Sequence, residues 1–222
     1  MMSDYKLRLI EDNLAAGAQI SLPEIAGYRV TYVARGDVEI RAEGGGAEAE
    51  SLVENSGRFG SAACSAHSRE GSTLWRWELV KRSADDWPED PQSNLKASHE
   101  LELDPAQGEY MMRCDRVDFP PGGVAYTHIH SGPGLRCLLR GELSVIVDDE
   151  ETLVEPGGTW FERGPDPVFA QASDSELTSF VRSMVLPRSY KGTTSITYVK
   201  PGDADKPKLQ EYTRYVDEFI NL

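Results

Sequence analysis

The sequence predicts an all-β protein in which one barrel or sandwich unit occurs twice. Three observations lead to this prediction. Short segments rich in β-branched and aromatic residues recur along the chain and are separated by Gly, Pro, Asp or Ser. No long segment has helical periodicity with capping residues. The two halves of the chain also share a pattern of glycines, which is typical of a duplicated framework.

Six segments have the composition of β-strands, and turn-forming residues bound each of them. They are residues 28–34, 37–42, 72–80, 111–119, 143–149 and 177–186. Short strands at this regular spacing favour a β-sandwich or a barrel.

Matching glycines stand at one constant offset in the two halves. The pairs are Gly17 and Gly122, Gly27 and Gly132, and Gly36 and Gly141, each 105 residues apart. Farther along, "ESLVENSGRF" resembles "ETLVEPGGTW". Turns constrain backbone dihedral angles more tightly than they constrain surface side chains, so the shared glycines favour two copies of one framework over chance identity.

The segment 81–98 is polar, acidic and contains prolines, which indicates a linker. We therefore expect an N-terminal barrel in residues 1–90 and a C-terminal barrel in residues 91–222. The tail that begins at residue 186 follows the last expected strand. It could be an arm laid on the barrel or on a partner subunit, or a loosely docked end.

Composition excludes several classes of protein. The formal net charge of -14 disfavours nucleic-acid and anionic-membrane partners, because both surfaces are negative. No apolar run approaches a membrane span, and the first residues do not resemble a secretory signal, so a cytoplasmic protein is expected. Three cysteines without C-x-x-C spacing, Cys64, Cys114 and Cys137, fit reduced thiols.

Two of the four histidines, His128 and His130, are separated by one residue. Alternation along a strand places both on one face, with Cα atoms about 6.6 Å apart, together with Tyr126. Two imidazoles so placed can converge on one metal ion. An exposed or hydrogen-bonded pair without a metal is the alternative, but the first copy has Pro23 and Ile25 at the matching positions, which points to one functional barrel beside a degenerate one.

These residues resemble the cupins, a family of small jelly-roll barrels whose first motif, G-x5-H-x-H-x3,4-E-x6-G, supplies metal ligands. Gly122, His128, His130 and Gly141 match it, while Gly134 stands at the glutamate position. The second motif is matched loosely from Gly157, and its histidine position falls on Val168. The resemblance implies two tandem cupin-type jelly-roll β-barrels, and it makes a homodimer reasonable.

A carboxylate could complete the metal shell. Glu162 is the first candidate and Asp166 the second, with a solvated edge position as the alternative for Glu162. A set of two histidines and one carboxylate suits iron and related oxygen chemistry. Arg136 shares the inward parity of Gly134, and its buried charge would need Glu162 or an anionic ligand. An arginine that reaches water at the barrel mouth is the other possibility.

The functional hypothesis is a C-terminal barrel that binds a divalent metal, such as Fe, Mn, Ni or Zn, through His128, His130 and Glu162. A small, anionic molecule would bind on Arg136 and Tyr126, in a metal-dependent dioxygenase or related enzyme. The alternative is a non-catalytic ligand-binding or interaction module with an eroded metal site. An epimerase-like reaction that uses a histidine base and a tyrosine acid has weaker support.

Overall fold

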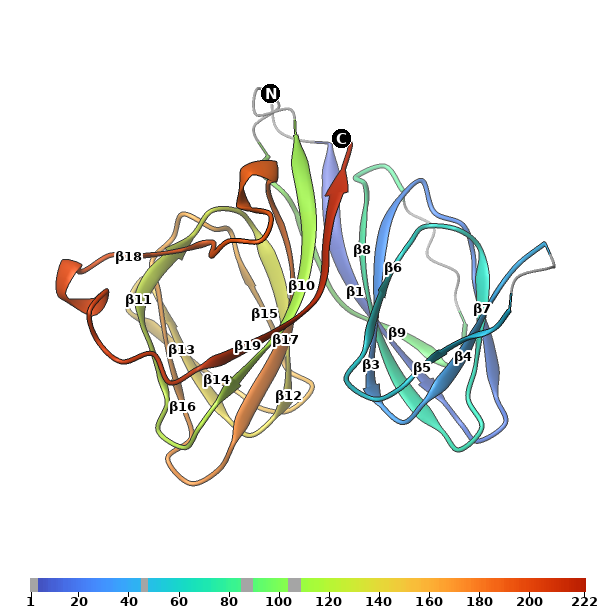
Figure 1. Cartoon of the computed structure of the whole chain (residues 1–222), viewed down its shortest axis with the longest axis horizontal. Helices are drawn as coiled ribbons and strands as arrows, with labels where there is room; N and C mark the ends of the chain where they lie inside the picture. The colour runs from blue at the N-terminus through green and yellow to red at the C-terminus, as the bar shows by residue number, and fades with distance from the viewer. Residues whose placement is uncertain (1–3, 45–47, 85–89, 104–108) are drawn as a thin grey trace. The chain divides into compact units, whose positions relative to one another are not determined.

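A computed structural model describes residues 4–44, 48–84, 90–103 and 109–222 of the chain. The chain forms two compact units, Asp4–Leu101 and Glu102–Leu222, each built from antiparallel β-strands (Figure 1). The helical structure in the described ranges consists of two short 3₁₀ turns, η2 (Arg188–Tyr190) and η3 (Pro201–Asp203). Within these ranges, no helix has the length and apolar character required to span a membrane.

The N-terminal unit has two sheets, with strand orders β6-β3-β8-β1-β9 and β2-β7-β4-β5. The first sheet contains β1 (Tyr5–Leu14), β3 (Gly27–Arg35), β6 (Gly57–Phe59), β8 (Ser72–Lys81) and β9 (Ser93–Glu100). The second contains β2 (Gln19–Leu22), β4 (Val38–Ala42), β5 (Glu50–Leu52) and β7 (Cys64–His67). Side chains from both sheets, among them Leu14, Ile20, Val33 and Leu74, form one apolar core.

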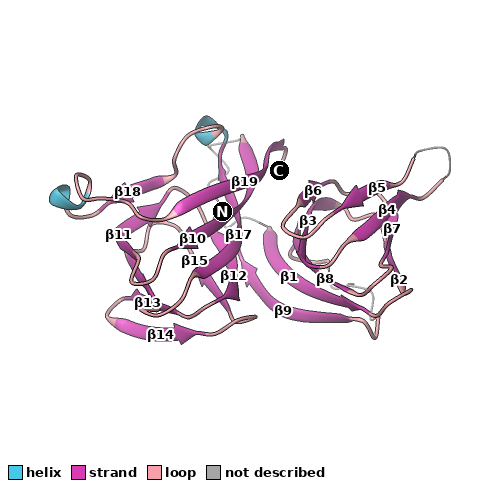
Figure 2. Ribbon diagram, turned by 60° about the horizontal axis from the view of Figure 1, so that its bottom comes forward, coloured by secondary structure: helices cyan, strands magenta, loops and turns pink. Residues whose placement is uncertain are grey.

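The C-terminal unit also has two sheets, with strand orders β15-β12-β17-β10-β19 and β14-β13-β16-β11-β18. The first contains β10 (Tyr110–Phe119), β12 (Gly134–Arg140), β15 (Thr159–Glu162), β17 (Thr178–Pro187) and β19 (Glu211–Ile220). The second contains β11 (Val124–His130), β13 (Leu143–Val147), β14 (Glu150–Val154), β16 (Val168–Ala172) and β18 (Ile196–Tyr198). Figure 2 shows the two sheets of this unit facing each other.

The two units repeat one topology. Replacing β1 to β8 by β10 to β17, and β9 by β19, converts the sheets of the first unit into those of the second, where β18 is an additional edge strand. Each unit is therefore a two-sheet jelly-roll barrel, and the predicted all-β fold is confirmed. All six strands expected from composition are present, as β3, β4, β8, β10, β13 and β17.

The same backbone geometry requires glycine at the paired positions of the two units. Gly36 and Gly141 have φ angles of +73° and +75°, in the left-handed region that other residues rarely adopt. At Gly27 and Gly132, a Cβ atom would overlap the carbonyl oxygens of Leu79 and Val185, which lie at equivalent places in β8 and β17. The shared pattern therefore reflects backbone geometry.

The prediction of a linker at residues 81–98 is wrong where β9 begins. This strand pairs with β1 from Asp12↔Ser93 to Lys6↔Glu100. The compact units consequently divide after Leu101, whereas the sequence analysis divided the chain between residues 90 and 91. Residues 85–89 of that segment lie outside the described ranges. The C-terminal tail is likewise part of the barrel, because β19 pairs along β10 and β18 pairs with β11.

Candidate functional site

Strand β11 carries the histidine pair, and an irregularity in its pairing determines which side chains face inward. The register with β16 shifts between Ala125 and His128. Ala125, His128 and His130 therefore line the cavity of the C-terminal barrel, whereas Tyr126 does not. The shift corrects the expected parity, which had placed Tyr126 beside the histidines. The ring of Tyr126 instead lies 4.4 Å from the Lys206 Nζ atom.

The tautomer of His128 follows from its contact with the backbone. Its Nδ1 atom lies 2.7 Å from the carbonyl oxygen of Tyr126, and because a carbonyl only accepts, Nδ1 carries the proton. In the neutral ring, Nε2 then presents a lone pair. This Nε2 atom lies 3.2 Å from Nε2 of His130, and the two rings are nearly perpendicular.

Glu162 reaches the same place from β15, where it is the register partner of Gly134 on β12. Its Oε2 atom lies 3.2 Å from His130 Nε2 and 2.5 Å from Arg136 Nη2, while Oε1 accepts a hydrogen bond of 2.9 Å from Trp160 Nε1. The carboxylate is 8% exposed, so the solvated edge position considered for it is excluded.

Arg136 is fully buried, which excludes a side chain that reaches water. Its Nη1 donates a hydrogen bond of 2.6 Å to the carbonyl oxygen of Gly134, and its charge is balanced by Glu162. The expected partner of this guanidinium was either Glu162 or an anionic ligand, and in the structure it is Glu162.

Burial and the Arg136–Glu162 pair set the protonation states. Burial lowers the pKa of His130 to about 3 and also lowers the pKa of His128. Burial alone would raise the pKa of Glu162, but the charge of Arg136 and the contact with His130 hold it below its ordinary value. Burial lowers the pKa of Arg136 to about 10. At neutral pH the site thus contains two neutral imidazoles and one carboxylate–guanidinium pair.

The sequence analysis missed a second buried ion pair, in which Arg182 lines the cavity. Arg182 on β17 donates to Asp115 on β10, with Nε–Oδ1 and Nη2–Oδ2 distances of 2.6 and 3.2 Å. Arg182 is also the register partner of Arg136. Arg182, as the one charged residue of β17, was the available signal, whereas Asp115 is one of four charged residues in β10. Ile196 and Tyr212, from the C-terminal tail, complete the lining and were also missed.

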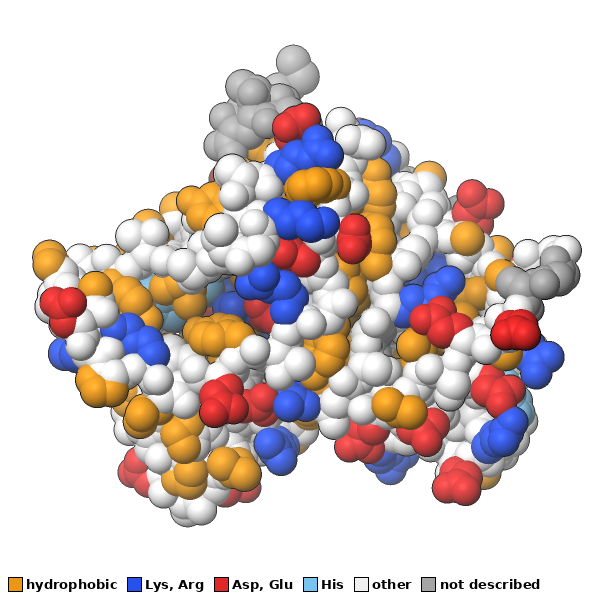
Figure 3. All heavy atoms as spheres, in the orientation of Figure 1, with side chains coloured by type: hydrophobic (Ala, Val, Ile, Leu, Met, Phe, Trp, Pro, Cys, Tyr) orange, Lys and Arg blue, Asp and Glu red, His pale blue; other side chains and the backbone are white. Residues whose placement is uncertain are grey.

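The remaining cavity has a volume of about 20 Å³, which is enough for a water molecule and too little for an organic substrate. In Figure 3, histidine atoms are visible at the bottom of a hollow in this barrel. Tyr198 of β18 lies above His128, with 6.5 Å between the ring centroids. A larger molecule can bind only if side chains of the lining move.

Two of the distances between donor atoms match those found around a divalent metal ion. Neighbouring ligand atoms around an ion with bonds of about 2.1 Å are themselves roughly 3.0–3.4 Å apart, and both contacts of His130 Nε2 are 3.2 Å. Four buried atoms of the site have no hydrogen-bond partner in the part of the chain that the structure describes: His130 Nδ1, Glu162 Oε2, and Nε and Nη2 of Arg136. The close contacts of Oε2 therefore lack hydrogen-bond geometry.

As the side chains stand, no three His, Cys, Asp or Glu residues in the described ranges are arranged as a metal site. Glu162 Oε2 is nearer to Arg136 than to His130, so ion binding requires the carboxylate to turn away from the guanidinium.

No protein-family model matches the chain, and no curated protein matches it in sequence. Solved structures do match it. Oxalate decarboxylase from Lactobacillus farciminis, as a formate complex, is 10% identical with a TM-score of 0.65, over 91% of this chain and 82% of that one. AerE from Microcystis aeruginosa is 12% identical with a TM-score of 0.59, over 83% and 88%. A cupin 2 conserved barrel domain protein from Leptotrichia buccalis is 18% identical with a TM-score of 0.48, over 83% and 90%.

The chain has the cupin fold. Two of the positions at which it departs from the cupin motifs, both of them ligand positions of those motifs, lie in this site. Gly134, at the glutamate position, faces Glu162 across the sheet. Val168, at the histidine position, faces His128. At Gly134, the carboxylate of Glu162 on the neighbouring strand takes the place of the missing glutamate. At Val168, an apolar side chain lies opposite the imidazole of His128.

Proposed function

We propose that the C-terminal cupin barrel binds a divalent metal ion through His128, His130 and Glu162 and acts on a small anionic molecule. The observation that carries this proposal is the convergence of His128 Nε2 and Glu162 Oε2 on His130 Nε2, each at 3.2 Å, in a buried cavity. Two neutral imidazoles and one carboxylate suit Fe, Mn, Ni or Zn. A bound ion would supply Lewis-acid or oxygen-activating chemistry.

The protein groups around the ligands have separate roles. The Tyr126 carbonyl oxygen holds His128 in the tautomer whose Nε2 is free to bind a cation. Arg136 holds Glu162 within reach of His130 and neutralises it while no cation is present. Buried apolar side chains, such as Val168 and Ala170, exclude bulk water from the cavity.

An anionic substrate is supported by the two guanidinium groups, Arg136 and Arg182, that line the cavity. When Glu162 turns toward a cation, Arg136 loses its partner and becomes free to bind a carboxylate. The similar oxalate decarboxylase forms a complex with formate, which agrees with a small carboxylate. A dioxygenase or related reaction is part of this proposal, as is the homodimer that the resemblance implies.

The second candidate function is a non-catalytic binding module. Val168 at the position of a fourth ligand favours it, together with the direct pairing of Glu162 with Arg136. In this case Glu162 stays paired with Arg136, and the barrel holds a ligand without turnover.

Metal analysis tests the first proposal. Protein stripped with a chelator and reloaded with Mn²⁺, Fe²⁺, Ni²⁺ or Zn²⁺ should bind one equivalent, and His128→Ala and His130→Ala should lose it. His67→Ala, a half-buried histidine of the N-terminal unit, is the matched control and should bind as the unmodified chain does. Unchanged stoichiometry in His128→Ala would end the proposal. Oxygen uptake by the loaded protein with small carboxylates then separates an enzyme from a binding module.

A further inference from the structure

The N-terminal barrel contains a cavity of about 300 Å³, a size typical of small-molecule pockets. Its lining consists of Arg8, Pro23, Glu24, Ile25, Arg29, Arg76 and Glu78. Pro23 and Ile25 stand at the repeat positions of His128 and His130. The cavity is therefore at the place where the other barrel has its histidines, but arginines replace the imidazoles as its polar groups.

The strand register shows which residues differ between the two barrels at this place. Arg29 on β3 is the register partner of Glu78 on β8, and the equivalent pair in the C-terminal barrel is Gly134 and Met184. A charged pair thus occupies the position at which the C-terminal barrel has a glycine and a methionine.

Glu78 is at the centre of this network. Its Oε1 accepts hydrogen bonds from Arg29 Nε at 2.8 Å and Arg76 Nη1 at 2.9 Å, and its Oε2 accepts from Arg8 Nη2 at 2.7 Å. Asp12 accepts two hydrogen bonds from Arg76, at 2.5 and 2.8 Å. Asp12 also accepts a hydrogen bond of 2.5 Å from Ser93 Oγ, so both oxygens of each carboxylate have donors.

The buried charges do not balance. Three arginines, at most 4% exposed, face two carboxylates, Asp12 and Glu78, at most 1% exposed, which leaves one positive charge in excess. Arg29 carries the unused donor. Its Nη2 donates to the Pro23 carbonyl oxygen at 2.7 Å, whereas its buried Nη1 has no hydrogen-bond partner among the described residues. A buried, unpaired cationic donor is strongly unfavourable unless an anion meets it.

We propose that the N-terminal barrel binds a small carboxylate, as a monoanion, on Arg29 with Arg8 and Arg76 beside it. The excess of one charge sets the charge of the ligand, and the buried Nη1 donor supplies its hydrogen bond once the Arg29 side chain turns toward the cavity. The site needs no metal ion and is separate from the histidine site. Glu24 is the exposed carboxylate of the lining, and it opposes the entry of anions.

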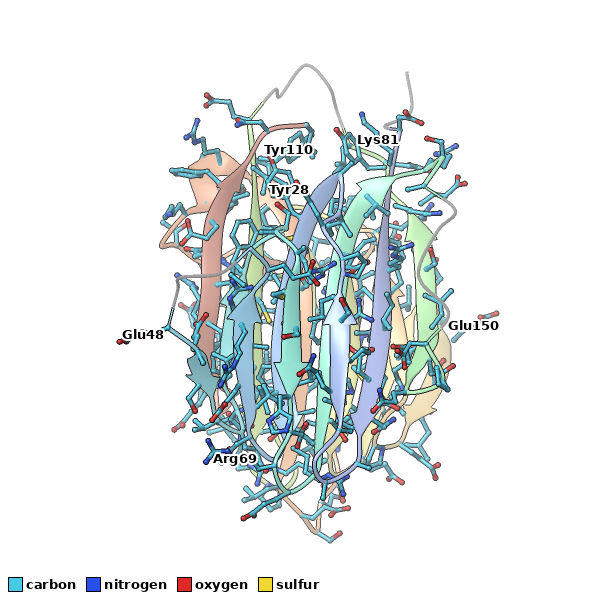
Figure 4. All side chains as sticks on the ribbon, turned by 90° about the vertical axis from the view of Figure 1, so that its right-hand side faces the viewer. Tyr28, Glu48, Arg69, Lys81, Tyr110 and Glu150 are labelled. Carbon is cyan, nitrogen blue, oxygen red and sulfur yellow. The ribbon has the colours of Figure 1, made fainter. Side chains whose placement is uncertain are left out.

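Titration of the full-length, chelator-treated protein with acetate, at constant ionic strength and followed by calorimetry, tests this proposal. We expect saturable binding of one equivalent, weakened at least tenfold in Arg29→Met. That substitution leaves two arginines against two carboxylates, so the remaining charges balance. Arg69→Met is the control, because Arg69 is exposed and lies at the opposite end of the barrel from Tyr28, the neighbour of Arg29 (Figure 4). Absence of saturable binding, or equal affinity in Arg29→Met, would overturn the proposal.

A second variant tests the proposal even if Arg29→Met does not fold. Glu24→Gln changes an exposed side chain and removes the negative charge of the lining that faces the entering anion. Acetate should bind it several-fold more tightly than it binds the unmodified chain. Unchanged or weaker binding would contradict an anion site in this cavity.

Discussion

Glu162 faces Gly134 directly across strands β15 and β12, so a carboxylate from one strand stands where the neighbouring strand has no side chain. Gly134 also leaves room for Arg136, which donates to the Gly134 carbonyl oxygen and pairs with Glu162. The ion pair between Arg136 and Glu162 therefore depends on the absence of a side chain at position 134.

Substitution of Gly134 by alanine is expected to destabilise the protein by about 1–3 kcal/mol. An added Cβ atom would lie 2.6 Å from Met184 Cγ and 3.1 Å from Arg136 Nη1, so both side chains would have to shift. Urea unfolding measures the effect. At Gly202 a Cβ meets nothing within 4 Å, which makes Gly202→Ala the control. Equal losses in the two variants would contradict this explanation.

Arg136→Met should destabilise the metal-free protein by about 3–5 kcal/mol, because it leaves the buried charge of Glu162 uncompensated. A divalent ion should then restore more stability than it adds to the unmodified protein, since Glu162 is free to bind it. Thermal unfolding with and without Zn²⁺ measures both effects. Arg163→Met, which breaks an exposed pair with Asp166, should change stability by at most about 1 kcal/mol. A metal-free Arg136→Met protein as stable as this control would refute the prediction.

Val168→His should tighten metal binding about tenfold or more, because it adds an imidazole opposite His128. The larger side chain overfills a cavity of about 20 Å³, so the metal-free variant should also be less stable. Competition with a chromophoric chelator measures the affinity. Ala170→His, at another position in the lining but opposite Ala125, controls for added bulk. Equal affinities of the two variants would show that position 168 does not face the ion.

Glu78 should make the stability of the N-terminal barrel depend on acid pH. Burial alone would raise its pKa, but the charges of Arg76, Arg29 and Arg8 outweigh burial and lower the pKa below the ordinary value of 4.5. The unfolded chain therefore binds the proton more readily than the folded chain. The stability that Glu78 contributes is complete above about pH 4.5 and is lost as the pH falls toward the lowered pKa.

Unfolding free energies of the unmodified protein and Glu78→Gln, measured between pH 3 and 7, check this prediction. The difference between the two proteins should be constant above about pH 5 and should shrink below about pH 4.5. A difference that does not change with pH would show that Glu78 is not the titrating group.

The sequence predicted the barrel framework well because glycines mark backbone geometry directly. Gly36 and Gly141 share a left-handed φ angle at equivalent turns, and such a constraint leaves a mark in any sequence. The inward positions of His128, His130 and Arg136 followed from strand alternation. Tyr126 was misplaced because a register shift interrupts that alternation without any local sequence signal.

Contacts between distant strands set the limit of prediction. Arg182 and Asp115 pair across β17 and β10, 67 positions apart in the chain, and nothing near either residue reveals the other. β18 and β19 were missed for a similar reason, since their edges are defined by β11 and β10. The role of Glu162 could be suggested, but its partner depended on the register between β12 and β15.

Gly27 and Gly132 pack against equivalent carbonyl oxygens in barrels whose interiors share one arginine position, Arg76 and Arg182, but differ at the positions of the histidines. The same barrel framework therefore accommodates an imidazole pair in one half of the chain and a guanidinium cluster in the other. Protein designers could graft inward-facing residues from one half into the other while keeping every turn intact.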